Sequence, residues 1–119
     1  LSEAIAILER LLDLPDLSEA LQVEVGYKLG LVLRRGDDPA RAREVFTLTV
    51  AAYLLGPDRM EDLGRIGQYW LSRTVLELGA ILALEGEREE ARRLYRKMIA
   101  FTLPGRSIAL ERLQVSSVN

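Results

Sequence analysis

Two apolar stripes at helical spacing, separated by Gly86, dominate the stretch from Ser72 to Gly105. Apolar residues three, four and seven positions apart share one face of an α-helix. Glycine suits the left-handed position just past a helix end, and Pro104 disfavours helical conformation in the residue before it. The stretch therefore predicts two helices folded back on each other. The stripes are Leu76, Gly79, Leu82 and Ala83, then Ala91, Leu94, Tyr95, Met98 and Phe101.

The same pattern occurs earlier in the chain. Its first element is a Leu-Gly pair, and its second is an alanine followed four positions later by a large apolar residue. This recurrence predicts an all-α chain built from similar helix pairs. The matching residues are Leu29-Gly30 with Ala42 and Phe46, Leu78-Gly79 with Ala91 and Tyr95, and Ala4 with Leu8.

Turn residues separate the predicted helices. Asp16 with Glu19 resembles a capping box, which predicts a helix from there to about Arg35. The run from Gly36 to Pro39 combines a glycine stop, an aspartate cap and a proline at the first helical position. These breaks divide one domain into a second helix (1–15), a helix pair (16–56), a pair with a lengthened first helix (57–105), and a capping helix with a frayed tail (106–119).

The later pair resembles a tetratricopeptide repeat, whose pattern runs W-x2-L-G-x2-Y, then A-x3-F, then P over about 34 residues. The matching residues are Leu78-Gly79, Leu82, Gly86, Ala91 and Tyr95. Val75 replaces the first aromatic residue, and Pro104 falls one place late. The resemblance implies αα-hairpins stacked as a short right-handed superhelix, which recognises other proteins and has no catalytic site.

The spacing of the pattern is irregular. Ala4 and Ala42 are 38 residues apart, and Ala42 and Ala91 are 49 apart. The additional residues lie before Leu71, where an apolar face that includes Trp70 continues into the next predicted helix. One long helix from about Arg59 to Glu85 fits this pattern, and a break near Gly64 and Gly67 is the alternative. We expect the long helix, either straight or kinked, and place Trp70 in the core. If the segment stands clear, Met60, Leu63 and Trp70 form an exposed stripe.

Composition excludes several functions. The 119 residues contain no Cys and no His, so no Ser–His or Cys–His nucleophile pair and no His or Cys metal site can form within them. We expect no enzyme activity and no cofactor. The net charge of −2 indicates no nucleic-acid partner, and no apolar run is long enough for a membrane span.

Two features of the sequence bear on its source. Arginine outnumbers lysine by 14 to 2, which is typical of GC-rich bacterial genomes. Leu1 falls in the middle of a helical pattern, so we expect a piece of a longer protein whose compartment cannot be predicted from these residues.

The resemblance also implies a binding site, because the first helices of tetratricopeptide repeats line a groove that receives a peptide or a helix. Members that clamp a peptide's terminal carboxylate carry Lys and Asn where this chain has Tyr and apolar residues, so that clamp is absent. We expect a mostly apolar groove with an arginine rim that binds a protein or peptide. The alternative is a structural role in which these residues pack against neighbouring helices or a homodimer partner. The implied groove residues are Tyr27, Leu31, Arg34, Arg35, Arg73, Leu76, Ala80 and Leu84.

Overall fold

The structure, a computed structural model, describes residues 2–54, 56 and 58–118. These residues form six α-helices and no strand, which confirms the all-α prediction. Leu1, Pro57 and Asn119, at the edges of the predicted segments, lie outside the described residues. The helices are α1 Ser2–Leu12, α2 Glu19–Arg35, α3 Pro39–Ala51, α4 Asp58–Leu84, α5 Arg88–Ala100 and α6 Arg106–Val118.

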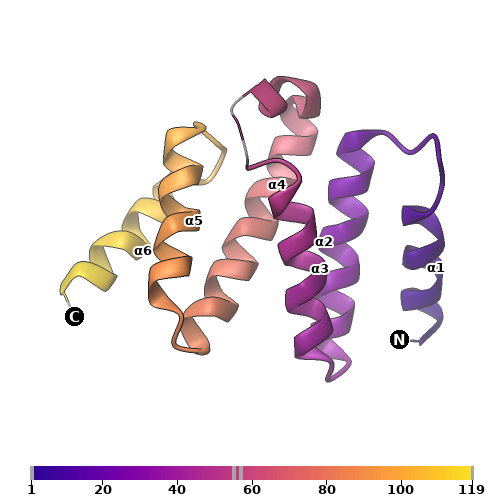
Figure 1. Cartoon of the computed structure of the whole chain (residues 1–119), viewed down its shortest axis with the longest axis horizontal. Coiled ribbons are helices and arrows are strands. Elements are labelled where there is room, and N and C mark those ends of the chain that lie inside the picture. Colours follow the sequence, from indigo (N-terminus) through magenta and orange to yellow (C-terminus); the bar gives the residue numbers. More distant parts are fainter. Residues whose placement is uncertain (1, 55, 57, 119) are drawn as a thin grey trace.

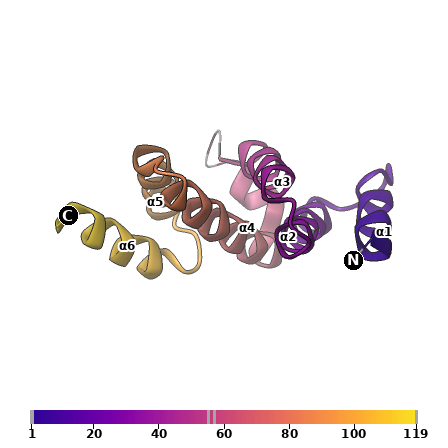
Figure 2. The same ribbon diagram turned by 90° about the horizontal axis from the view of Figure 1, so that it is seen from below.

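The helices follow one another along the long axis of the molecule, from α1 at one end to α6 at the other (Figure 1). Each helix packs against the next one in the chain, and α2 also packs against α4. Helices α3 and α5 lie in one layer, and α2 and α4 lie in the other (Figure 2). The Cα atoms span 43 × 34 × 18 Å. Because one helix is about 10 Å wide, the molecule is two helices thick, and many apolar side chains reach its surface.

The helix ends follow the predicted breaks with one displacement. Ser18, rather than Asp16, caps α2, and its hydroxyl accepts a hydrogen bond from the Leu21 backbone amide. The capping box was predicted two residues too early, because a serine next to the first helical residue serves the same donors. Asp38 caps α3 as predicted. Gly86 adopts the expected left-handed conformation, with φ of 84°.

Two glycines allow each helix pair to pack closely. A Cβ atom on Gly30 of α2 would lie 2.1 Å from the ring of Phe46 on α3. A Cβ atom on Gly79 of α4 would lie 2.5 Å from the hydroxyl of Tyr95 on α5. Both side chains are buried, since Phe46 is 0% exposed and Tyr95 is 4% exposed. The Leu-Gly pairs therefore mark the points where the helix pairs make contact.

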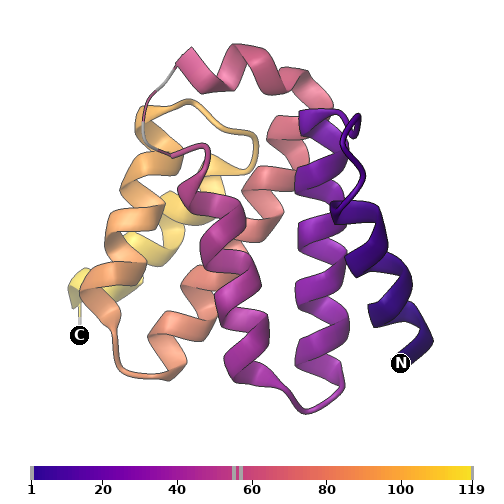
Figure 3. The same cartoon turned by 45° about the vertical axis from the view of Figure 1, so that its right-hand side comes forward.

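Helix α4 is interrupted at Gly64, where φ is 69° and ψ is −179°. These angles are accessible almost only to glycine. The segment before Gly64 crosses the ends of the neighbouring helices instead of continuing along α4 (Figure 3). The expected long helix from about Arg59 to Glu85 is therefore wrong, and the alternative break at Gly64 is correct. Gly67 is helical and buried, and the site of an added Cβ lies 3.3 Å from the Ala20 backbone.

The short segment of α4 is anchored by polar contacts near its start. Arg59 forms an ion pair with Glu19 of α2 at 2.9 Å, and its guanidinium lies over the ring of Tyr53. Gln68 donates a hydrogen bond of 2.7 Å to the carbonyl of Met60. Met60 and Leu63 are buried, so the exposed apolar stripe considered for this segment does not form.

The C-terminal region is more helical than expected. Helix α6 extends to Val118, which includes most of the predicted frayed tail. It packs against α5 as the capping helix was expected to do. Arg112 of α6 donates hydrogen bonds of 3.0 Å to the Leu76 carbonyl and to the Tyr95 hydroxyl. One arginine thus ties α6 to both helices of the later pair.

The break in α4 predicts the sign of a stability change. In a continuous helix, an exposed Gly→Ala substitution raises the free energy of unfolding by about 1 kcal/mol. We expect Gly64→Ala to lower it by about 1–3 kcal/mol, because alanine strains these backbone angles. Urea denaturation followed by circular dichroism measures the change. No atom lies within 4 Å of the added Cβ, so packing does not contribute. A stabilised variant would show that α4 is continuous.

Candidate interaction surface

Helices α2 and α4 run side by side in the same direction and bring three aromatic residues together. Tyr27 comes from α2, and Tyr69 and Trp70 come from α4. The ring centroids of Tyr27 and Trp70 are 5.6 Å apart, and those of Tyr69 and Trp70 are 5.1 Å apart in an edge-on arrangement. Aromatic pairs at these separations attract each other beyond their apolar burial. The contacts join the two helices at this point.

Two cations lie over the aromatic residues. The Arg73 guanidinium lies 5.4 Å from the Tyr27 ring centre and 5.6 Å from that of Tyr69. Its Nε donates to the Tyr27 hydroxyl at 3.2 Å, and its Nη1 donates to the Tyr69 hydroxyl at 3.1 Å. These hydrogen bonds, first that to Tyr27, raise the pKa of Arg73, which therefore keeps its charge. The Lys28 ammonium lies 5.3 Å from the Trp70 ring centre.

Exposure increases from the base of this cluster to its surface. Tyr27 is 4% exposed, Trp70 is half-buried and Tyr69 is 45% exposed. Ile66, one turn before Trp70, is 69% exposed. We call Lys28, Ile66, Tyr69, Trp70 and Arg73 the α2–α4 face. Its aromatic residues rest on the core and also reach solvent.

The eight implied groove residues divide between two regions. Tyr27 and Arg73 meet within the aromatic cluster, and Arg34 forms an ion pair of 2.6 Å with Glu77. Leu31 is half-buried and Arg35 is exposed.

Leu76 and Ala80 are half-buried on the part of α4 that approaches α6, where Arg112 bonds the Leu76 carbonyl. Leu84 is 80% exposed at the end of α4.

Sequence reasoning missed Lys28, Ile66 and Tyr69 as surface-site residues. Positions were carried over from the family pattern, and Ile66 and Tyr69 lie in the additional residues before Leu71 that the pattern does not include. The sequence did indicate that Tyr69 lies near Arg73, because the two are four residues apart and therefore share one helical face. Trp70, expected in the core, is half-buried at its edge.

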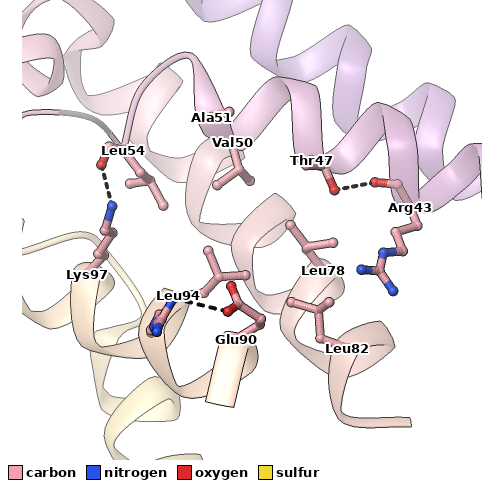
Figure 4. Close-up of a pocket in the computed structure, with 11 residues that line it drawn as sticks. Arg43, Thr47, Val50, Ala51, Leu54, Leu78, Leu82, Glu90, Leu94 and Lys97 are labelled. Carbon is pink, nitrogen blue, oxygen red and sulfur yellow. Dashed lines mark hydrogen bonds and ion pairs between the residues drawn. The ribbon is translucent and has the colours of Figure 1, made fainter. Parts of the chain in front are cut away.

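A concavity that the sequence did not predict lies between α3 and α5. Its volume is about 370 Å³, and α4 contributes Leu78 and Leu82 to its floor (Figure 4). The cations at its rim already have partners. Arg93 pairs with Glu90 at 3.1 Å, and Lys97 donates to the Leu54 carbonyl at 3.0 Å. The groove therefore presents an apolar interior with a polar edge whose cations are already engaged in hydrogen bonds and ion pairs.

Arg43, at one end of this groove, joins α3 to the turn between α4 and α5. Its Nη1 bonds Glu85 at 3.0 Å and also bonds Glu87. The hydrogen bond from Arg43 is the main cause that lowers the pKa of Glu87 below its usual value of 4.5. Glu87 does not cap α5 through its side chain. Its carboxylate connects the two helix pairs instead.

The described part of the chain offers neither a metal site nor a membrane-spanning helix. Residues 2–54, 56 and 58–118 contain no group of three or more His, Cys, Asp or Glu side chains placed to hold a metal ion. Among these same residues, no helix has the length and apolarity that crossing a bilayer requires. Comparison with protein-family models, with curated proteins and with solved structures found no match.

The link between Arg43 and Glu87 predicts acid-sensitive stability. Because the folded-state pKa of Glu87 is lowered, its contribution is present above about pH 4.5 and is lost as the pH falls through the folded-state value. We expect Arg43→Met to reduce the loss of stability between neutral pH and about pH 3. Urea denaturation midpoints at the two pH values measure this loss of stability.

Arg35→Met provides the matched control, because Arg35 is exposed and belongs to none of the ion pairs among the described residues. It should retain the acid sensitivity of the unmodified protein. Equal acid sensitivity in all three proteins would contradict a stabilising role for the Arg43–Glu87 pair.

Proposed function

We propose that this chain is a non-enzymatic protein-interaction module built from tetratricopeptide-like helix pairs, which binds a peptide or helix on its α2–α4 face. Two contacts support the repeat interpretation. Gly30 meets the Phe46 ring and Gly79 meets the Tyr95 ring, with the same spacing of sixteen residues in each pair. The left-handed residues Asp37 and Gly86 also stand at equal distances after these glycines. A superhelix of stacked hairpins accounts for both correspondences.

The observation that carries the binding proposal is the exposure of large side chains on the α2–α4 face. Tyr, Trp and Arg dominate the residues that contribute most to protein–protein binding. Tyr69, Trp70 and Arg73 supply all three types within two helical turns. Trp70 and Arg73 contact the buried Tyr27, and Tyr69 contacts both of them. These contacts hold the three side chains in place before a partner arrives, which reduces the entropy lost on binding.

Selection from a random dodecapeptide library on the immobilised protein tests the proposal. We expect the selected peptides to change the fluorescence of Trp70, the single tryptophan in the chain. Ile66→Ser and Tyr69→Ala should each weaken binding by about tenfold or more, since each removes an exposed contact. Titration of each variant measures the dissociation constant.

Leu48→Ser is the matched control, because Leu48 of α3 is 67% exposed and Ile66 is 69% exposed. It should leave peptide affinity unchanged. If Leu48→Ser weakens binding as much as Ile66→Ser does, peptides bind elsewhere and the proposal fails.

Self-assembly is the second candidate function, and the two ends of the helix array favour it. Helix α1 has no buried residue, and Ile7 is 55% exposed. At the other end, Ile108, Leu110 and Val115 are between 42% and 59% exposed. Apolar side chains at both ends suit head-to-tail association between copies.

Sedimentation velocity at several protein concentrations distinguishes self-assembly from peptide binding. If the chain self-assembles, we expect its sedimenting mass to rise with concentration. The Ile7→Ser and Val115→Ser variants should sediment as monomers. Ile66→Ser should leave the mass unchanged, because Ile66 lies on the α2–α4 face. A monomer at every concentration would contradict this candidate.

A further inference from the structure

Two arginines of α4 have no acidic partner among the residues that the structure describes. No carboxylate in the described residues lies within ion-pair distance of Arg65 or Arg73, whereas Arg34, Arg43 and Arg59 all have one. Both arginines are exposed. They stand four residues before and four residues after Tyr69, so the three side chains share one side of the helix. An apolar and aromatic surface therefore lies between two available positive charges.

The guanidinium of Arg73 is held by two tyrosines and keeps donors for a carboxylate. Its Nε and one N–H of Nη1 are used by Tyr27 and Tyr69. A guanidinium has five N–H donors, so three stay available, one on Nη1 and two on Nη2. Arginine pairs with carboxylates through two parallel hydrogen bonds. Because the tyrosine hydroxyls already hold the side chain, less conformational entropy is lost when such a pair forms.

We propose that the α2–α4 face, together with the adjacent Arg65, binds an acidic, extended peptide segment, in which two Asp or Glu residues flank a central apolar residue. This inference rests on the proposed function and specifies its partner. Arg65 and Arg73 are separated by eight residues, or about 12 Å along a helix. An extended chain covers that distance in about four residues. The segment therefore places acidic side chains at positions i and i+4 and an apolar side chain at i+2.

The alternation of side chains in an extended strand fits this arrangement. Residues i, i+2 and i+4 point to the same side of a strand. The outer two reach Arg65 and Arg73, and the central one lies against Ile66 and Tyr69. Both groups of contacts can therefore form at once without bending the peptide.

A phosphodiester backbone fits the same face less well. Single-stranded nucleic acids require a continuous cationic groove with stacking aromatic residues. Here Glu24 pairs with Lys28, and Glu77 pairs with Arg34, on α2 and α4 next to the face. The net charge of the chain is −2. Two separated positive charges suit two carboxylates better than a row of phosphates.

Two synthetic dodecapeptides test the inference on the full chain. One has Glu at i and i+4 with Leu at i+2 in an otherwise Ser/Gly sequence, and the other has Gln in place of both Glu. Trp70 fluorescence at low salt measures binding. We expect the acidic peptide to bind about tenfold more tightly or better, because charged pairs are lost in the amide peptide. The double variant Arg65→Met/Arg73→Met should bring the two affinities to within about twofold, and Arg93→Met on α5 should not.

Other outcomes distinguish failure of the acidic-peptide inference from failure of the proposed peptide-binding function. Equal affinity for the two peptides, or library peptides that bind while neither synthetic peptide does, would overturn the acidic partner and leave peptide binding intact. Tighter binding of a dodecathymidine oligonucleotide would overturn it in favour of nucleic acid. The absence of any library binder would overturn the proposed function and this inference together. Circular dichroism confirms that each variant is folded.

Discussion

Close approach of helices at glycine is the constraint on which the rest of this fold depends. The Phe46 ring occupies the space beside Gly30, and the Tyr95 ring occupies the space beside Gly79. Any side chain at either glycine would push the helices of that pair apart. When the two helices of each pair are closely packed, α2 and α4 also pack directly against each other. That contact assembles the aromatic cluster and positions the α2–α4 face.

The thinness of the molecule explains why its surface contains so many large apolar groups. An array only two helices thick leaves each helix with one side facing solvent. Trp70 packs against the core while Tyr69, the residue before it, is exposed, because neighbouring positions on a helix point in different directions. The proposed binding face is therefore a continuation of the core, and contacts that stabilise the fold also orient Arg73.

Local patterns in the sequence were sufficient where the determinant was local. The cap at Asp38 and the left-handed turn at Gly86 were predicted correctly, since each depends on one residue and its immediate neighbours. The break at Gly64 was identified only as an alternative. A glycine inside an apolar pattern is compatible with both a continuous and a broken helix. Here the ion pair from Arg59 to Glu19, forty residues away, and the burial of Met60 favour the broken form.

The sequence by itself determined the all-α class and most helix ends, because apolar periodicity and turn residues act within a few positions. Only the tertiary structure decided which side chains form the α2–α4 face. The pairing of Tyr27 with Arg73 spans 46 residues, and the side of Tyr69 that faces solvent depends on the bend at Gly64. Spacing within a single helix contains no information about such contacts, since they arise only when separate helices pack together.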